Sequence, residues 1–268
     1  MKILALTAVN LEEKYLSCVP YFIDFWLALK SHRSDVSFEP KVLVVAGELP
    51  IELLDYRNWC ELYSCSEELS SVFVSQNIRT LQPSLESSDY VITTDVDMLP
   101  LHTRVFMSAI EEILSGEEIV ICRDVLSPGQ YPICYNLASP ATWNKINNVN
   151  CTEDIDKKLV EVFEQISSNG DYRGQHGGSG WFTDQEILYE EINMFEKLGG
   201  RVKKLSDRDT RHRRLDRLWH PFPINWLLLP LVPFGFFSDY HVHHPIGLHK
   251  RYVKIVLSLL KFRNKLII

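Results

Sequence analysis

The sequence lacks several features that would each place it in another class of protein. Its six cysteines form no CxxC pair, which disfavours a zinc ribbon or a thioredoxin-like redox site, and we expect free thiols in a reducing compartment. No apolar run reaches the roughly 18 residues of a membrane-spanning helix. The apolar run at residues 3–9 is too short for a signal peptide and is interpreted as a first strand. These absences predict a cytoplasmic protein.

Acidic residues are scarce in the last quarter of the chain and abundant before it. Residues 1–200 hold 14 Lys and Arg against 31 Asp and Glu, a balance of −17, whereas residues 201–268 hold 14 against 4, a balance of +10. The acidic body argues against nucleic acid as a partner. The basic part predicts contact with phosphates on a ligand or at a membrane surface, with a simple solvated face as the alternative.

The chain is long enough, at 268 residues with 46% hydrophobic content, to bury a full core. Short apolar runs alternate with amphipathic segments, which predicts an α/β protein with a mostly parallel sheet flanked by helices. Apolar residues recur at three- and four-residue steps in residues 15–29 and 155–166, so both segments are predicted helices. The predicted strands are residues 3–7, 42–46, 90–94 and 119–122. We expect one domain over residues 1–250 and a basic amphipathic extension at residues 251–268.

The most informative signal is the pair Asp95 and Asp97, which directly follows the apolar strand at residues 90–94. Ligands of open α/β sheets collect at the carboxyl ends of strands, and two carboxylates there can hold Mg²⁺ or Mn²⁺ against a diphosphate. Two other Asp-x-Asp triplets, at residues 154–156 and 207–209, follow no apolar strand. The context therefore carries the prediction. The alternative is that Asp95 and Asp97 only cap a helix or stabilise a turn.

A glycine-rich segment precedes a second polar motif. Residues 174–180 contain four glycines in seven residues and predict a loop that orders over a substrate. Asp184 and Gln185, at the start of the following helix, would then face a sugar. The alternative is a plain connection with Thr183 as the helix cap. A phosphate-binding P-loop is disfavoured because no Gly-Lys-Ser or Gly-Lys-Thr follows.

Four histidines crowd into residues 241–249, just ahead of Lys250 and Arg251. Imidazole joins carboxylates at borderline metal ions, and Lys250 would offset the charge of a diphosphate. A structural zinc site is not predicted, because the segment supplies no sulfur donor. Either His243 or His244 could be the metal ligand.

The ordered motifs resemble the GT-A glycosyltransferases, most closely the retaining family 8 that includes glycogenin and bacterial lipopolysaccharide galactosyltransferases. The resemblance covers most of the chain. Its four elements are Arg79 in the helix ahead of the aspartate pair, Asp95-Val-Asp97, Asp184-Gln185-Glu-Ile-Leu and His244-Pro-Ile-Gly247-Leu-His-Lys250. Two positions depart from the family. Arg251 replaces a proline, and Tyr135-Asn136-Leu-Ala replaces Phe-Asn followed by small residues.

The resemblance implies a Rossmann-like GT-A fold with a metal-bound diphosphate. Asp95, Asp97 and His244 would ligate Mn²⁺ or Mg²⁺. Asp184 and Gln185 would line the reacting face of the donor sugar as catalytic residues. The residues that would contact the nucleotide-sugar donor are Thr7, Ala8, Asn10, Arg79, Asp95, Gly247 and Lys250.

The sequence thus predicts a metal-dependent hexosyltransferase that moves a sugar from a nucleoside-diphosphate sugar, with a UDP-sugar favoured, to a carbohydrate or glycolipid hydroxyl. Retention is expected from the resemblance, and inversion with Asp184 as the base is the alternative. A metal-dependent nucleotidyltransferase or phosphohydrolase and a noncatalytic sugar-binding module are the competing classes.

The last segment has an apolar face between residues 252 and 262 and six cations between residues 250 and 265, with no acid. This composition predicts either a helix that lies on an anionic membrane or a helix that docks on the sheet with its basic side in water.

Overall fold

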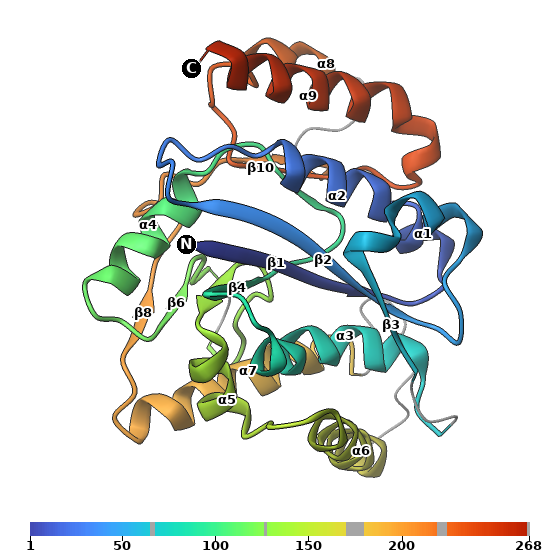
Figure 1. Ribbon diagram of the computed structural model, residues 1–268, viewed down its shortest axis with the longest axis vertical. Helices are drawn as coiled ribbons and strands as arrows, with labels where there is room; N and C mark the ends of the chain where they lie inside the picture. Colours follow the sequence, from blue (N-terminus) through green and yellow to red (C-terminus); the bar gives the residue numbers. More distant parts are fainter. Residues whose placement is uncertain (65–67, 126–127, 170–179, 219–223, 267–268) are drawn as a thin grey trace.

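The computed structural model describes residues 1–64, 68–125, 128–169, 180–218 and 224–266. Their main sheet, shown edge to edge in Figure 1, is built from β1 (Lys2–Val9), β2 (Ser37–Val45), β3 (Cys60–Tyr63), β4 (Tyr90–Thr93), β6 (Ile119–Ile121), β7 (Asn136–Ala138) and β8 (Val202–Lys204). Over the described residues the sheet has seven strands in the order β3-β2-β1-β4-β7-β6-β8. All four predicted strands are confirmed, and the α/β class with them.

The sheet is mostly parallel, as predicted. β1 pairs in parallel with β2 and β4, β2 with β3, and β6 with β8, whereas β7 runs antiparallel to β4 and β6. Successive residues of β1 enter different cores: Ile3 and Ala5 pack on one face, Leu4 and Leu6 on the other. Both faces of this strand are covered, so its apolar residues run without interruption.

Helices cover both faces of the sheet (Figure 1). The helices are α1 (Glu13–Leu16), α2 (Val19–Ala28), α3 (Ser71–Leu81), α4 (Arg104–Leu114), α5 (Pro140–Asn147), α6 (Thr152–Asn169), α7 (Thr183–Lys197), α8 (Ile224–Leu227) and α9 (Ile246–Leu266), with 3-10 turns η1 (Ile51–Trp59), η2 (Gln82–Leu85) and η3 (Leu229–Leu231). One core contains residues of α2, α4 and α9, and the other contains residues of α3, α5, α6 and α7.

Two predicted helices have different outcomes. The helix at residues 155–166 is confirmed within α6. The single helix expected at residues 15–29 is instead two helices, α1 and α2. Pro20 lies in the first turn of α2, where its missing N–H costs no hydrogen bond and its fixed φ favours a new helix start.

A second, small sheet is the element that positions the candidate site. It contains β5 (Met98–Pro100), β9 (Arg214–Asp216) and β10 (Asp239–His241), with β10 in the middle. β10 is antiparallel to β5 and parallel to β9. Because β5 begins directly after Asp97, this pairing brings the histidine cluster beside the aspartate pair.

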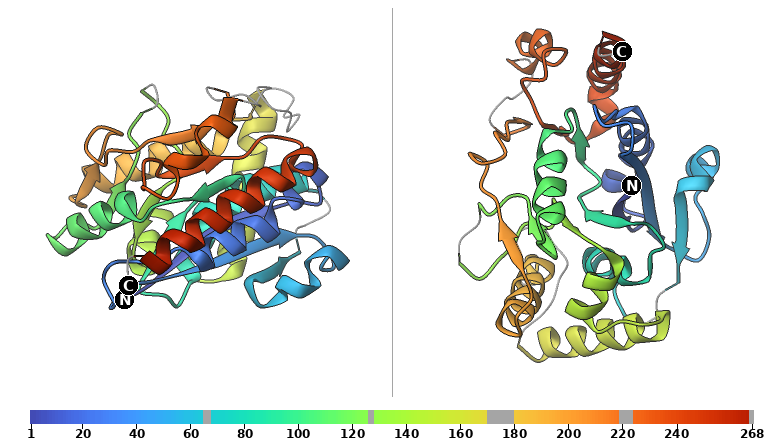
Figure 2. Two further views of the ribbon diagram at one scale, coloured as in Figure 1. Left: turned by 90° about the horizontal axis from the view of Figure 1, so that it is seen from above. Right: turned by 60° about the vertical axis from the view of Figure 1, so that its left-hand side comes forward.

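The basic end of the chain forms α9, which begins before the expected boundary at residue 250 and continues through it. The apolar side of α9, including Tyr252, Val256 and Leu260, is buried in the core beside α2. The structure thus has the alternative in which the last helix docks on the body of the protein. α9 packs on α2, which lies between α9 and the sheet (Figure 2). Among the described residues, no helix is both long and apolar enough to cross a bilayer.

The cysteines in the described ranges are free thiols, as expected: Cys18, Cys60, Cys122, Cys134 and Cys151. Burial raises the pKa of the Cys60 thiol to about 11. It also raises the pKa values of Cys18 and Cys122. Thiols of this kind behave as small hydrophobic side chains rather than as nucleophiles.

Candidate active site

Asp95 and Asp97 lie in the short link between β4 and β5, at the carboxyl end of β4, as the sequence predicts. In the β5–β10 pairing Met98 lies opposite His241. The backbone N–H of Val242 donates to the carbonyl of Asp97 across 3.0 Å. The histidine segment is therefore fixed over the aspartate pair by backbone hydrogen bonds.

Three cationic or protonatable groups converge on one carboxylate oxygen of Asp97. Its Oδ2 lies 3.1 Å from His244 Nε2, 3.4 Å from His241 Nε2 and 2.8 Å from Arg217 Nη1. Burial alone would raise the pKa of Asp97, but the hydrogen bonds from His241 and His244 hold it well below its usual value. Asp97 is thus an ionised carboxylate in a largely buried position.

His244 and His243 have different surroundings, which decides the alternative that the sequence leaves open. His244 reaches Asp97, whereas His243 is buried and its Nδ1 lies 3.1 Å from the hydroxyl of Tyr240. In the described residues His244 is therefore the histidine of this pair that faces the candidate site.

His241 is held by a carboxylate on its other side. Its Nδ1 lies 3.1 Å from Asp216 Oδ2, because Asp216 lies opposite His241 in the β9–β10 pairing. Burial alone would lower the pKa of His241, but the hydrogen bonds to Asp216 and Asp97 raise it. A carboxylate that fixes the far nitrogen of an imidazole is the usual support for a metal-binding histidine.

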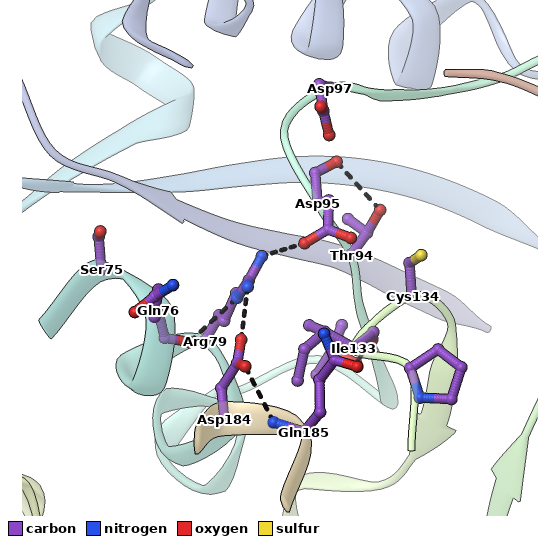
Figure 3. Close-up of polar contacts among 12 residues, drawn as sticks. Ser75, Gln76, Arg79, Thr94, Asp95, Asp97, Ile133, Cys134, Asp184 and Gln185 are labelled. Carbon is purple, nitrogen blue, oxygen red and sulfur yellow. Dashed lines mark hydrogen bonds and ion pairs between the residues drawn. The ribbon is translucent and has the colours of Figure 1, made fainter. Parts of the chain in front are cut away.

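Arg79 joins the first aspartate to the motif at the start of α7 (Figure 3). Its guanidinium contacts Asp95, and its Nη2 lies 2.6 Å from Asp184 Oδ2. Asp184 is only 2% exposed, and burial raises its pKa although Arg79 opposes the change. The other Asp184 oxygen, Oδ1, accepts the backbone N–H of Gln185 at 2.9 Å. Both carboxylate oxygens of Asp184 are therefore engaged.

The predicted metal ligands are brought to one region but not into one cluster. Asp97 faces His244, whereas Asp95 faces Arg79. In the ranges that the structure describes, no group of three or more His, Cys, Asp or Glu side chains is already closed around a metal position.

Two of the donor atoms have the separation that joint ligation of a divalent ion requires. Two neighbouring ligands at about 2.1 Å from an octahedral ion are themselves about 3 Å apart. Asp97 Oδ2 and His244 Nε2 have this separation, and His241 Nε2 is slightly farther away. One carboxylate with imidazole nitrogens suits Mn²⁺ better than Mg²⁺, which prefers oxygen ligands. A metal at this oxygen requires Arg217 to release it.

An open cavity of about 190 Å³ contains most of these groups. The predicted residues that line it are Ala8, Asn10, Arg79, Asp95, Asp97, Asp184 and Gln185. Thr7 is fully buried in β1, and Gly247 and Lys250 are exposed in the first turns of α9, so these three are not part of the cavity lining. His244 is not part of the lining either, and it lies beside the cavity through its contact with Asp97. Residues 174–179 of the glycine-rich segment lie outside the described residues.

The start of α7 agrees with the predicted position of Asp184 and Gln185 but not with the alternative in which Thr183 is the cap. Thr183 is the first residue of α7 rather than its cap, and its hydroxyl donates to the carbonyl of Gly180 at 2.6 Å. Asp184 lies in the first turn, as expected for a residue that faces the site.

Several cavity residues were missed by the sequence analysis. Arg217 and Tyr15 were not predicted as site residues, yet both line the cavity. The ring of Tyr15 meets that of His244 edge-on at 6.0 Å between centroids. Burial and the nearby Asp97 raise the pKa of Tyr15 to about 12. Neither residue belongs to a recognisable sequence motif. The histidine cluster was therefore the only sequence signal for this part of the site.

The two other Asp-x-Asp triplets have structural roles away from the cavity. Asp207 pairs with Arg123 through two contacts of 2.8 and 2.7 Å, and Asp154 accepts the backbone N–H of Asn150 at 2.8 Å. The strand context, rather than the triplet, identified the relevant aspartates.

No protein-family model and no curated protein sequence matches the chain. Solved structures do match. The glycosyltransferase GlyE of Streptococcus pneumoniae TIGR4 superposes with a TM-score of 0.51 at 14% identity, covering 100% of this chain and 64% of GlyE. The fold is the GT-A glycosyltransferase fold. The chain thus spans less than two thirds of the length of GlyE.

Two further solved structures show lower similarity. Mouse xyloside xylosyltransferase 1 has a TM-score of 0.46 at 9% identity, covering 91% of this chain and 98% of that one. Glucosyl-3-phosphoglycerate synthase of Mycobacterium tuberculosis has a TM-score of 0.39 at 14% identity, covering 98% and 79%. At 14% identity the similarity to GlyE concerns the fold alone, so the activity is argued from the site.

Proposed function

We propose that this chain is a metal-dependent glycosyltransferase that moves a hexose from a nucleoside-diphosphate sugar to the hydroxyl of a carbohydrate or glycolipid. One observation carries the proposal. Asp97 and His244, which are 147 residues apart in the sequence, meet at 3.1 Å beside a cavity at the carboxyl end of β4. This is the place where an open α/β sheet binds its ligand, and the two side chains are complementary to a cation that a diphosphate would need.

Asp97 and His244 would hold Mn²⁺, or less favourably Mg²⁺, and His241 is the next donor atom available. When bound, the ion acts as a Lewis acid that takes up charge on the leaving nucleoside diphosphate. Lys250 and Gly247, exposed at the start of α9, would approach the diphosphate, and Arg217 would add charge once released from Asp97.

Arg79 and Asp184 would shape the sugar subsite. The guanidinium of Arg79 fixes Asp184 at the cavity wall and leaves Gln185 beside it. Ala8 and Asn10, at the end of β1, would border the nucleoside. A UDP-sugar is favoured by the resemblance to family 8.

The contacts of Asp184 support retention over inversion. An inverting enzyme needs a carboxylate that is free to take the acceptor proton. Both oxygens of Asp184 are engaged, one by Arg79 and the other by the N–H of Gln185. Retention, with the leaving phosphate taking the acceptor proton, agrees better with this arrangement.

Thermal-shift screening of nucleotide sugars with and without Mn²⁺ tests the proposal, because a ligand that binds the folded state raises Tm by an amount that grows with the ratio of its concentration to Kd. We expect stabilisation by at least one donor only with the metal, followed by release of nucleoside diphosphate when an acceptor is added. Release of phosphate or pyrophosphate would instead support a phosphohydrolase or nucleotidyltransferase. Donor binding that survives Asp97→Asn without turnover would support a sugar-binding module.

A further inference from the structure

An apolar strip, residues 224–237, lies along the outside of α9 at one end of the molecule. It contains α8 and η3 and has no charged residue. The hydroxyl of Tyr252 donates to the carbonyl of Asn225 at 3.0 Å near the start of the strip. Near its end, a Cβ at Gly235 would lie 3.7 Å from Arg263 Nη1. Figures 1 and 2 show α8 and α9 side by side at the same end.

The strip buries part of its side chains and exposes the rest. Asn225, Val232 and Phe237 are buried, and Val232 and Phe237 belong to the core. In contrast, Leu227 is 79% exposed and Phe234 is 85% exposed. Ile224 and Phe236 are exposed as well. Several large apolar side chains in water on one short segment, held in place by a buried half, are typical of an interaction surface.

The charged residues around the strip are cations. The guanidinium of Arg213 lies 4.3 Å over the ring of Phe236. The exposed cations of α9 are Lys250, Arg251, Lys254, Lys261 and Lys265. Between residues 217 and 266 the sequence has one acid, Asp239, which is fully buried. From the neighbouring helix α2, Asp24 faces Lys261.

We propose that the apolar strip, together with the exposed cations of α9, binds the surface of an anionic lipid bilayer. Exposed aliphatic and aromatic side chains enter the headgroup boundary, while Lys and Arg beside them attract anionic lipids. The acidic body, with a balance of −17 over residues 1–200, turns this end toward the membrane and the remainder away from it.

This surface differs from the one that the sequence suggested. The apolar face of α9 was one candidate for membrane contact, but most of it is buried against the core, and Phe262, 54% exposed, is its large apolar side chain that remains in water. Most of the apolar side chains available to lipid at this end belong to the strip instead. A second copy of the chain is a poorer occupant, because a two-fold contact would place the cations of α9 close to their own equivalents.

One end of the surface lies close to the candidate active site. α9 begins directly after Pro245, the neighbour of His244, and Tyr252 in its second turn contacts Asn225 of the strip. A bilayer bound here would bring lipid-linked hydroxyl groups near the cavity. Lipid binding itself does not depend on the proposed transferase activity, because it can be measured without donor or metal.

Vesicle flotation of the full chain tests the proposal, with phosphatidylcholine vesicles compared with vesicles of phosphatidylcholine mixed with phosphatidylglycerol. We expect the protein to float only with the anionic vesicles and to be released by high salt. The double variant Leu227→Glu/Phe234→Glu should bind at least about 10-fold more weakly, because it places charge in the inserted surface. Arg251→Gln/Lys254→Gln should bind about 10-fold more weakly through lost attraction.

Leu198→Glu is the matched control, since Leu198 is 80% exposed at the far end of α7 and should bind vesicles like the wild type. Thermal melts verify that each variant is folded. Equal weakening by Leu198→Glu, or no binding of the wild type to anionic vesicles, would overturn the proposal. A dimer in sedimentation that Leu227→Glu/Phe234→Glu dissociates, without any vesicle binding, would also overturn it and assign the strip to self-association.

Discussion

Arg79 and Asp184 form an ion pair inside the protein, with Nη2 2.6 Å from Oδ2 and the carboxylate only 2% exposed. The same guanidinium contacts Asp95, so one arginine from α3 ties the start of α7 to the end of β4. This pair is therefore part of the frame of the cavity as well as of its chemistry.

Replacing Arg79 by Met should lower the free energy of unfolding by about 3–5 kcal/mol, because the buried carboxylate of Asp184 loses its partner. Urea denaturation at neutral pH measures the change. Arg33→Met is the matched control, since it removes a solvent-exposed pair with Asp35 and should leave stability unchanged. Equal stability of the Arg79 variant and the wild type would contradict the structural role.

Asp97→Asn should abolish the Mn²⁺-dependent thermal shift and reduce sugar transfer by at least about 100-fold, since it removes the charge that faces His244 and the metal. Asp209→Asn changes an exposed aspartate of another Asp-x-Asp triplet and should alter neither quantity. Unchanged transfer in Asp97→Asn would remove the basis of the proposed function.

Asp216→Asn should weaken Mn²⁺ binding by about 10- to 100-fold, because it releases the far nitrogen of His241. Titration of free Mn²⁺ by electron paramagnetic resonance measures this without turnover. His241→Gln should have a similar or larger effect, whereas His243→Gln should leave the affinity unchanged because His243 contacts Tyr240. If His243→Gln weakened Mn²⁺ binding more than His241→Gln did, the ligand assignment would be wrong.

Stability should fall as the pH decreases from about 6.5 to about 4, partly through His102. Burial, with Arg263 and Arg104 nearby, lowers the pKa of His102 from 6.5 to about 4. In this window the unfolded chain binds a proton that the folded chain does not, so acid favours unfolding. His102 Nδ1 also accepts the N–H of Arg104 at 3.0 Å, which a protonated ring loses. In urea denaturation between pH 7 and 5, the free energy of unfolding of His102→Asn should decrease less steeply with falling pH than that of the wild type. An identical pH dependence of the two proteins would contradict this origin.

Gly235→Ala should lower the free energy of unfolding by about 1–3 kcal/mol. Gly235 has φ of +67°, and an added Cβ would lie 2.5 Å from the ring of His102. Gly47→Ala is the control, because nothing lies within 4 Å of its Cβ and its backbone is not left-handed. Thermal or urea unfolding separates the two, and comparable stabilities would show that the turn after η3 tolerates a side chain.

Much of the fold could be predicted because its signals are local. The apolar runs at β1, β2, β4 and β6 are buried on both faces and therefore continuous in the sequence. The break between α1 and α2 was missed, although Pro20 marks it, because the apolar periodicity continues across the break and outweighed the proline.

The sequence by itself determined the α/β class, the strand that ends at Asp95 and Asp97, and a histidine cluster that could supply partners for these aspartates. Tertiary structure decided which groups meet. The pairing of β5 with β10 selects His244 and His241. The neighbouring β9 adds Asp216, the residue after it adds Arg217, and Arg79 holds Asp95 on the side away from Asp97. The β5–β10 pairing and the contacts of Asp97 with Arg217 and His244 join segments more than a hundred residues apart. Pairing of three-residue strands leaves no periodic pattern that a local reading of the chain detects.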